Sequence, residues 1–292
     1  MLHTNTFGNL KYVLPALLVY TAFVLLPIMA SIVLGFTEWG GIGMPKFVGF
    51  ANYVALFSDP MFFKALRNTA VLMVFYVALP LCIGLALAVA ISNIRPGERM
   101  ALRMLYFMPY VMPSAVLGII WRWLYNPIFG PLNQVLRAVG LGALALPWLG
   151  DFNFALPAVG MVATWYYLGF CMAIFMAGLQ RIDASLFEAA ALEGASGRQT
   201  FRYITLPSLL PEIRIVLLLT VIASIKSYDL VFTMTRGGPA NETLVANLYM
   251  YQLGFELNRY GYASAVAVIG AIFILVVNGI VHRVLPTDGD NA

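Results

Sequence analysis

Long apolar runs without charged side chains recur along this chain of 292 residues, and they constrain its fold more than any other feature. A helix needs about 20 apolar residues to cross the hydrocarbon core of a bilayer, and every backbone amide inside that core must be bonded within the protein. The composition agrees, with 61% hydrophobic and 10% charged residues. We therefore predict an all-α integral membrane protein.

Six runs are long enough to serve as membrane spans. They cover residues 12–37, 68–94, 104–122, 154–180, 208–235 and 260–282. The fifth is the least regular, because Lys226 and Asp229 interrupt its apolar pattern. Its length and its place in the chain identify it as a span. No polar segment between the runs is large enough to fold alone, so residues 1–292 are expected to form one transmembrane domain with six helices.

Arginines gather in two short connections, one between the second and third runs and one after the fourth run. They are Arg95, Arg99, Arg103, Arg181, Arg198 and Arg202. Short loops rich in Lys and Arg remain in the cytoplasm. With six spans, both chain termini are then predicted to be cytoplasmic. The same arginines account for much of the net charge of +4, which does not indicate a nucleic-acid partner.

Sequence motifs for catalysis are absent. No Gly-x-x-x-x-Gly-Lys-Ser/Thr run occurs, so the chain has no P-loop of its own for ATP. Its two histidines, His3 and His282, form no zinc motif, and there is no Gly-x-Ser-x-Gly elbow. We expect a non-catalytic chain that binds neither a metal nor a cofactor itself.

The polar connection at residues 181–207 has the pattern of a short capped helix. Ser185 and Glu188 have the spacing of a capping box, which predicts a helix start at Ser185. The alanines at 189–191 are strong helix formers. Gly194 stands where a residue in the left-handed conformation would end the helix.

A second helical stretch is predicted for residues 198–204. It leads to Leu206 and Pro207, where proline in the first turn suits the start of the fifth span. A well-capped connecting loop without any partner would show the same local pattern. The caps alone therefore do not assign a function.

The wider pattern of this loop is more specific. From Glu188 to Pro207 the sequence reads Glu-Ala-Ala, three residues, Gly, nine residues, Ile-x-Leu-Pro. This closely resembles the cytoplasmic loop of the permease subunits of binding-protein-dependent ABC importers. The family often has Asp where Glu193 stands here, and this difference keeps the charge.

Two further segments carry the same resemblance, which covers nearly the whole chain. Residues 47–53, followed by Asp-Pro-x-Phe-x-x-Ala-Leu-x-Asn-Thr at 59–69, look like the approach to the second span in the carbohydrate subfamily. Residues 235–239, Thr-Arg-Gly-Gly-Pro, resemble the Thr-x-Gly-Gly-Pro element of the maltose and glycerol-phosphate permeases. Within those pairs of permeases the element belongs to the first subunit.

The resemblance implies the type I ABC importer permease fold and an inward transport of a sugar or sugar derivative. It also implies a second homologous permease, two ATPase subunits that bind ATP and Mg²⁺, an extracytoplasmic solute-binding protein, and a location in the bacterial inner membrane. The loop at 181–207 would enter a cleft of one ATPase. The implied coupling residues are Glu188, Ala189, Ala190, Gly194, Leu206 and Pro207. For Glu188, a contact with the partner and a role in its own helix cap stay open together.

Polar side chains within spans are costly and therefore informative about the substrate path. Lys226 and Asp229 lie three residues apart, on one helix face, and are expected to pair with each other. The alternative is that they line the path together with Tyr228. They would then bind sugar hydroxyls or an anionic group such as a sulfonate or phosphate.

Three consecutive aromatic residues, Trp165, Tyr166 and Tyr167, fall near the centre of the fourth span, away from both membrane interfaces. Aromatic faces with polar tips suit carbohydrate, whose CH face stacks while its hydroxyls need partners. Helix packing is the competing role for at least one of the three. Outside the membrane, Trp39 and the turn of Gly237, Gly238 and Pro239 are candidates for contact with the binding protein.

A self-contained secondary carrier of a small polar solute is the alternative function. Such carriers are commonly built from internal repeats with paired broken spans. No convincing similarity relates residues 1–150 to residues 151–292. A membrane-embedded enzyme would need a reactive constellation within the spans, and Lys226 with Asp229 is too little.

Overall fold

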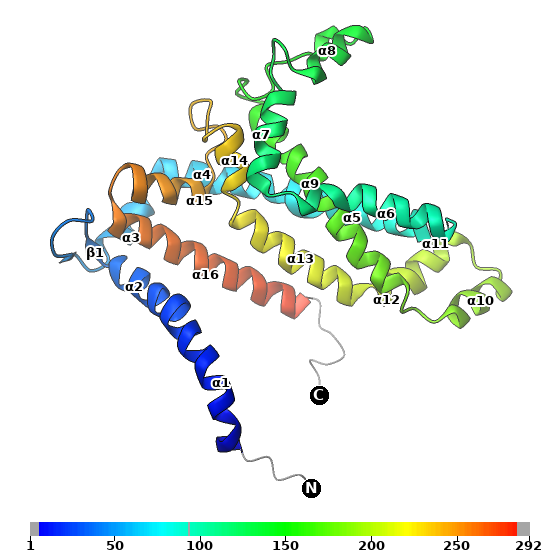
Figure 1. Cartoon of the computed structure of the whole chain (residues 1–292), viewed down its shortest axis with the longest axis horizontal. Coiled ribbons are helices and arrows are strands. Elements are labelled where there is room, and N and C mark those ends of the chain that lie inside the picture. The colour runs from blue at the N-terminus through cyan, green and yellow to red at the C-terminus, as the bar shows by residue number, and fades with distance from the viewer. Residues whose placement is uncertain (1–5, 93, 285–292) are drawn as a thin grey trace. The chain divides into compact units, whose positions relative to one another are not determined.

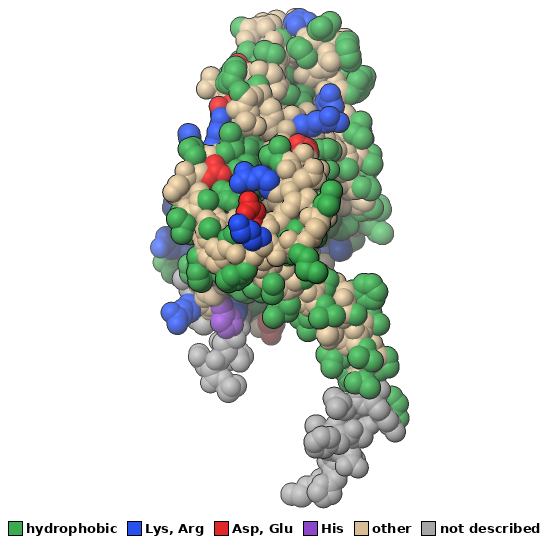
Figure 2. All heavy atoms as spheres, turned by 90° about the vertical axis from the view of Figure 1, so that its left-hand side faces the viewer, with side chains coloured by type: hydrophobic (Ala, Val, Ile, Leu, Met, Phe, Trp, Pro, Cys, Tyr) green, Lys and Arg blue, Asp and Glu red, His purple; other side chains and the backbone are tan. Residues whose placement is uncertain are grey.

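The computed structural model describes residues 6–92 and 94–284, and this part of the chain is almost entirely helical (Figure 1). Both chain termini, predicted above to be cytoplasmic, lie outside the described residues. Figure 2 shows that apolar side chains cover much of the face it displays, as expected for a protein surrounded by lipid and partner subunits. The all-α architecture predicted from the sequence is confirmed.

The helices follow one another with short breaks, and several consecutive ones join into longer rods. In the first part of the chain they are α1 (Thr6–Tyr20), α2 (Leu26–Leu34), α3 (Ala51–Leu56), α4 (Pro60–Met73), α5 (Leu79–Ser92), α6 (Pro96–Val111), α7 (Ser114–Leu124) and α8 (Pro131–Ala138). They continue with α9 (Ala155–Leu179), α10 (Ala184–Leu192), α11 (Gly197–Thr200), α12 (Leu206–Ser208), α13 (Leu210–Ile225), α14 (Asp229–Met234), α15 (Ala246–Tyr251) and α16 (Tyr260–Val284). Short π-helical segments (Thr21–Leu25, Val74–Ala78, Phe201–Thr205, Gln252–Glu256) and a 3₁₀ turn (Gly142–Leu144) complete the helical elements.

Contacts within the chain divide it into two compact units. One comprises residues 1–60 and 250–272, and the other comprises residues 61–249 and 273–292. Each unit is assembled from segments that are far apart in sequence. That residues 1–292 form one transmembrane domain stays a prediction.

The first unit contains the first apolar helix and a small hairpin. The helix runs from Tyr12 to Leu34, and its apolar window has 0% of its residues buried within the chain. The strands β1 (Thr37–Glu38) and β2 (Lys46–Phe47) pair antiparallel in the register Thr37 to Phe47. Gly41 and Gly43 in the hairpin loop have φ of 88° and 76°, a conformation that glycine adopts without steric cost.

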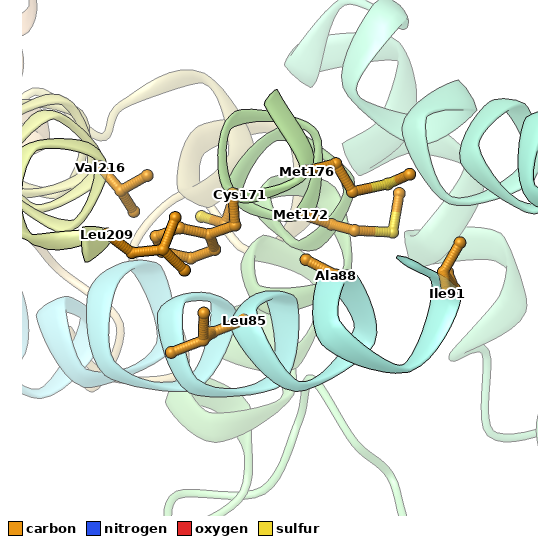
Figure 3. Close-up of a cluster of buried hydrophobic side chains, with 9 residues drawn as sticks. Leu85, Ala88, Ile91, Cys171, Met172, Met176, Leu209 and Val216 are labelled. Carbon is orange, nitrogen blue, oxygen red and sulfur yellow. The ribbon is translucent and has the colours of Figure 1, made fainter. Parts of the chain in front are cut away.

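The core of the second unit lies where α5, α9 and α13 meet (Figure 3). Its buried side chains are Leu85, Ala88, Ile91, Cys171, Met172, Phe175, Met176, Leu209 and Val216. Small residues allow this close packing, as is usual between membrane helices. A Cβ atom on Gly84 would lie 2.9 Å from Cys171 Cβ, and one on Gly169 would overlap the carbonyl oxygen of Tyr106.

Within residues 6–92 and 94–284, four helices are long and apolar enough to cross a membrane, and the number rises to six if each of two bent pairs counts as one span. The four are Tyr12–Leu34, Pro60–Ser92, Ala155–Leu179 and Tyr260–Arg283. The bent pairs are Pro96–Val111 with Ser114–Leu124, at 97°, and Gly197–Ser208 with Leu210–Ile225, at 64°. The third and fifth predicted spans are therefore not continuous helices.

The third predicted span breaks because of a proline. Pro113 follows Met112, whose backbone is extended with φ of −75° and ψ of 142°. Proline lacks an amide hydrogen and excludes its predecessor from the helical conformation, so α6 ends at Val111 and α7 begins at Ser114 in a new direction.

The fifth predicted span ends ten residues early. Helix α13 stops at Ile225, and residues 226–228 separate it from α14. Asn247 Nδ2 donates to the carbonyl oxygen of Lys226 at 3.1 Å, which satisfies one of the acceptors that the helix end leaves free. Lys226 and Asp229 consequently do not share one helix face.

Candidate functional site: a polar loop and a central cavity

Helix α10 in the polar loop is capped by Asp183, not by Ser185 as the sequence suggested. Asp183 has an extended backbone, and its Oδ1 accepts a hydrogen bond from the Ser185 amide at 2.9 Å. The predicted capping box of Ser185 and Glu188 is therefore wrong. Aspartate is as good a cap as serine and stands two residues earlier, so the local pattern allowed both. Glu188 does not take part in the cap of α10, and its side chain is exposed.

A true capping box occurs at the next helix. Ser196 caps α11, its amide donates to Gln199 Oε1 at 2.7 Å, and its side chain accepts from the backbone of Gln199. The second helical stretch thus begins at Gly197, one residue before the predicted start, and continues to Ser208.

The stability that the Asp183 cap contributes is expected to depend on pH. The Ser185 amide stabilises the carboxylate and lowers the pKa of Asp183. A carboxyl group with a depressed folded-state pKa contributes stability above its unfolded pKa of about 3.9 and loses it as the pH falls through the folded value. We expect hydrogen exchange at the Ser185 amide of the assembled complex to be faster in Asp183→Ala than in wild type at neutral pH. Asp183→Ser should retain most of the protection, and equal exchange in all three proteins would contradict the cap.

Gly194 ends α10 in the manner predicted. Its φ is +74°, its amide donates to the Ala191 carbonyl at 3.1 Å, and the Ala195 amide donates to the Ala190 carbonyl at 2.9 Å. These two bonds define a Schellman motif. Apart from its chain neighbours, no atom of the described residues lies within 4 Å of the place where a Cβ on Gly194 would stand, so the demand for glycine is conformational.

The predicted coupling residues differ in their accessibility. Glu188, Ala189, Gly194 and Pro207 are exposed, whereas Leu206 is half-buried. Ala190 is 8% exposed and faces the interior of its own unit. A partner could reach the first group directly, but Ala190 only through its neighbours.

The two most exposed apolar side chains on this loop escaped the sequence analysis. Leu192 is 90% exposed and Tyr203 is 72% exposed. Tyr203 borders a recess of about 390 Å³ that also includes Ala190, Glu193, Gly194, Ala195, Gln199, Thr200 and Ile204. The sequence held a signal for them, because large apolar residues inside a polar connection between spans are typical of an interface.

The two ends of the loop are joined by an ion pair. Arg181, directly after α9, bonds Glu212 in the first turn of α13. Glu212 is 5% exposed, and Gly178 leaves room for it, since a Cβ there would lie 2.6 Å from Glu212 Cδ. Arg181 is largely exposed, so it reaches from the surface to give the buried carboxylate of Glu212 a partner of opposite charge, and this contact links the end of α9 to the start of α13.

A cavity of about 300 Å³ lies at the break between α13 and α14. Its wall is formed by Tyr76, Ser114, Leu117, Tyr166, Tyr167, Leu219, Ile222, Ala223, Lys226, Ser227, Tyr228, Asp229 and Leu230. The structure thus brings together five of the six residues that the sequence placed on the substrate path. Tyr76, Ser114 and Ser227 are additions from the structure.

The aromatic rings of this cavity pack against one another. Tyr167 lies 5.2 Å from Tyr76 and 5.0 Å from Tyr166, measured between ring centroids. Trp165, the sixth candidate, packs on Trp121 at 5.5 Å and does not line the cavity. Helix packing is the role that the structure shows for it.

The expected pairing of Lys226 with Asp229 is wrong. Among the described residues, the ion pairs are Arg181 with Glu212 and Lys64 with Glu242. Asp229 instead accepts a hydrogen bond from Ser114 Oγ at 3.1 Å. The break after Ile225 removes the helical spacing on which the expectation rested.

The candidates for contact with a binding protein lie in different surroundings. In the first unit, Trp39 packs on Tyr260 at 5.5 Å and borders a cavity of about 460 Å³ that includes Glu38, Asn52 and Arg259. In the second unit, Gly237 is buried beside Leu244 and Leu248, while Gly238 and Pro239 are half-buried. Gly237 therefore serves the packing of its own unit.

Comparisons with known proteins agree with this architecture. The model of the family described as "Binding-protein-dependent transport system inner membrane component" matches residues 81–287. The diacetylchitobiose uptake system permease protein NgcF of Streptomyces coelicolor is 34% identical over 92% of this chain and 79% of its own length. The lactose transport system permease protein LacF of Rhizobium radiobacter is 32% identical over 91% of this chain and 90% of its own length.

A solved structure shows the same fold. The bacterial alginate ABC transporter in complex with an alginate pentasaccharide-bound periplasmic protein contains a chain that matches with a TM-score of 0.82 at 22% identity, over 96% of both chains. The family match and the fold together favour an ABC importer over a self-contained carrier. The chain belongs to the family of binding-protein-dependent transport system inner membrane components and is a permease subunit of an ABC importer.

Proposed function

We propose that this permease moves a sugar or sugar derivative inward across the bacterial inner membrane, after delivery by an extracytoplasmic binding protein. The relatives named above are permeases of diacetylchitobiose and lactose systems, which supports the substrate class. The observation that carries the proposal is the cavity at residues 226–228, where four tyrosines meet a carboxylate, an ammonium group and two serine hydroxyls.

The chemistry of this cavity suits carbohydrate. The rings of Tyr166 and Tyr167 offer apolar faces for the CH surface of a sugar, and their hydroxyls offer donors and acceptors. Asp229 accepts hydrogen bonds from sugar hydroxyls, and Lys226 donates them. Lys226 also provides a cation for an acidic substituent, so a sulfonated or phosphorylated sugar belongs to the proposed class.

The polar loop is the proposed contact with the ATPases. Two ATPase subunits would bind ATP and Mg²⁺, and a second, homologous permease would complete the transmembrane pathway. Glu188 and Ala189 present an exposed face of α10, and the recess beside Tyr203 can receive an apolar side chain of the ATPase. The ion pair of Arg181 with Glu212 would pass a movement of the loop to the spans that flank it.

The proposed orientation places this loop and both termini in the cytoplasm. The arginines in the connections around 95–103 and 181–202 support it through the positive-inside bias. Trp39 and the loop of Gly238 and Pro239 would then lie on the extracytoplasmic side, where the binding protein docks.

Sugar-stimulated ATP hydrolysis tests the proposal. The complete complex is reconstituted with its ATPases and binding protein and is assayed with a panel of neutral and acidic sugars. We expect one sugar class to stimulate hydrolysis. We also expect Tyr166→Ala to raise the sugar concentration for half-maximal transport roughly tenfold, since an aromatic contact contributes about 1.5 kcal/mol.

Trp165→Ala is the matched control, because Trp165 is the adjacent aromatic residue but packs on Trp121 outside the cavity. It should leave the half-maximal concentration unchanged in the assembled complex. Equal shifts in the two variants would contradict the assignment of the cavity, and a complex that no sugar stimulates would contradict the substrate class.

A further inference from the structure

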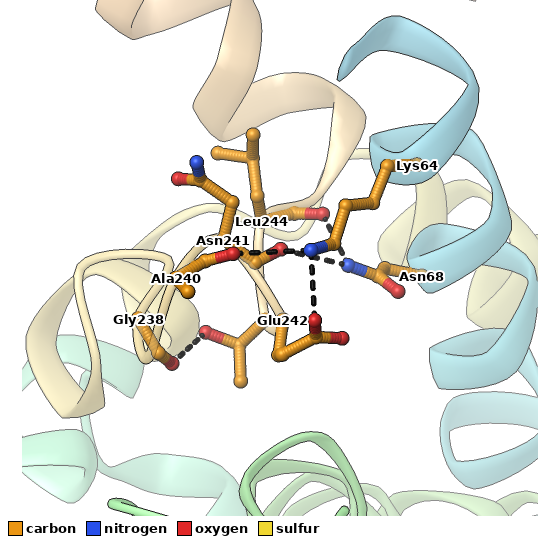
Figure 4. A network of polar contacts seen from close by, with 8 residues as sticks. Lys64, Asn68, Gly238, Ala240, Asn241, Glu242 and Leu244 are labelled. Atoms are coloured by element: carbon orange, nitrogen blue, oxygen red, sulfur yellow. Dashed lines mark hydrogen bonds and ion pairs between the residues drawn. The ribbon is translucent and has the colours of Figure 1, made fainter. Parts of the chain in front are cut away.

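Two sequence elements that do not line the central cavity meet in the structure. One is the Asp-Pro to Asn-Thr element at 59–69, which runs into α4, and the other is the Thr-Arg-Gly-Gly-Pro loop that follows α14. They are more than 160 residues apart in the sequence, and side chains of α4 bind the loop directly (Figure 4). We call these contacts the α4 clamp; its residues are Lys64, Asn68, Thr69 and the loop segment 235–246.

Three side chains of α4 make the clamp. Lys64 Nζ donates to the Ala240 carbonyl at 3.0 Å and pairs with Glu242 Oε1 at 2.8 Å. Asn68 Nδ2 donates to the Leu244 carbonyl at 3.0 Å and lies 3.4 Å from the Asn241 carbonyl. Thr69 Oγ1 accepts from the Ala246 amide at 3.0 Å. Asn68 and Thr69 are 6% and 3% exposed, so these bonds are sheltered from water.

The loop itself is shaped to reach these partners. Four of its residues, Arg236, Gly237, Ala240 and Asn241, have positive φ, between 43° and 87°. For residues other than glycine this conformation costs free energy and persists only where surrounding contacts enforce it. Thr243, fully buried, supplies one such contact, since its Oγ1 donates to the Gly238 carbonyl at 2.8 Å and lies 2.7 Å from Thr235 Oγ1.

Helix α14 is thereby held at both ends. Its first residue, Asp229, lines the cavity and accepts from Ser114 of α7. Its last residue, Met234, leads directly into the clamped loop. Along its length α14 packs on α7, where Gly118 leaves the space that Thr233 occupies. A helix of six residues has little stability of its own, so its position depends on these attachments.

We infer that the α4 clamp fixes the position of α14 and with it the Asp229 side of the central cavity, which makes Lys64, Asn68 and Glu242 positioning residues for transport. The inference rests on the proposed function for the identity of the cavity. The long rod that carries Lys64 and Asn68 also carries Tyr76, on the cavity wall. The helix Pro60–Ser92 and the segment of α14 with its following loop therefore meet at two places, the clamp and the cavity. The clamp sets the distance between the Tyr76 side and the Asp229 side of the cavity.

The number of sugar molecules imported per ATP hydrolysed tests this inference, because it does not depend on how much complex assembles. It is measured in proteoliposomes that contain the complete complex and its binding protein. We expect Lys64→Met and Glu242→Gln each to lower this ratio roughly threefold to tenfold, the range for losing one hydrogen bond of ordinary net strength in a partly exposed pair. The double variant Lys64→Glu with Glu242→Lys, which restores opposite charges, should recover part of the loss.

Glu98→Gln is the matched control, since it makes the same change at an exposed position in the first turn of α6. A ratio unchanged in both clamp variants, or lowered equally by the control, would overturn the inference. Hydrogen exchange of the amides at 230–235 gives a readout that is independent of transport and should speed up in the clamp variants. If the wild-type complex imports no sugar, the proposed function is wrong. If hydrogen exchange at 230–235 is the same in the clamp variants as in wild type, the inference about the clamp is wrong.

Discussion

Replacing Gly194 by valine is expected to uncouple ATP hydrolysis from the binding protein while the complex still assembles. Gly194 has a φ of +74° at the end of α10, and a β-branched residue cannot adopt this conformation without strain of about 1–3 kcal/mol. The residue is exposed and has open space around it, so valine meets no clash in the folded chain. The strain instead unwinds the Schellman turn that sets the direction of α10. We expect stimulated ATPase activity to fall at least about tenfold.

Gly194→Asn is the control for this prediction. Asparagine tolerates the left-handed conformation and ends helices in nature almost as glycine does. It should retain most of the stimulation, although it adds more polar atoms than valine does. If both variants lose activity equally, the surface of the turn matters and its backbone conformation does not. If neither loses activity, the turn has no part in coupling.

Replacing Gly169 by alanine is expected to have the largest effect on stability. A Cβ at this position would overlap the carbonyl oxygen of Tyr106 and would lie 2.7 Å from the Cα of Phe107. Both are backbone atoms of α6, so no side chain can rotate away, and α6 must separate from α9. Overpacking of this kind costs about 1–3 kcal/mol. We expect the apparent melting temperature of the assembled complex to fall by roughly 5 °C.

Gly270→Ala provides the comparison, since Gly270 also lies in a 25-residue helix but has no atom within 4 Å of its missing Cβ. Alanine is the better helix former, so this change should be neutral or slightly stabilising. Thermal unfolding of the two variants is monitored by size-exclusion chromatography in detergent. The comparison separates the effect of the contact with α6 from the effect of helix propensity. Equal melting temperatures would contradict the close approach of α6 and α9.

The sequence predicted those features that depend on local chemistry. Gly194 could be assigned to a left-handed turn because the alanine-rich helix before it needs an end, and glycine has no steric penalty there. The first residue of α10 was harder to predict, because Asp183 and Ser185 are both good caps and only the folded backbone decides between them. The bend at Pro113 could have been predicted, since proline restricts its predecessor in any context.

The central cavity could be predicted only in part. Tyr166 and Tyr167 stood out because they fall near the centre of a predicted span, and Tyr228 because it lies between the charged residues Lys226 and Asp229. Tyr76 and Ser114 were missed, since each looks like an ordinary residue of its own helix and joins the cavity only through packing of helices distant in sequence. The failure of the Lys226–Asp229 pairing has a related cause. The expectation required a continuous helix, and tertiary contacts such as that of Asn247 favour a break.

The α4 clamp lies beyond what one sequence can reveal. Its two elements were each visible as a pattern, but nothing in either indicates that Asn68 binds the carbonyl of Leu244. The ion pair of Arg181 with Glu212 belongs to the same group. These contacts join segments whose proximity is a property of the fold.

The central claim is that this permease imports a sugar only when separate ATPases hydrolyse ATP. The most direct measurement is uptake of a radiolabelled sugar into proteoliposomes that contain both permeases and the binding protein, with and without the ATPase subunits. We predict uptake against a concentration gradient that requires the ATPases and internal ATP and is lost in Gly194→Val. Sugar accumulation that persists without the ATPases would contradict this account and identify a self-contained carrier.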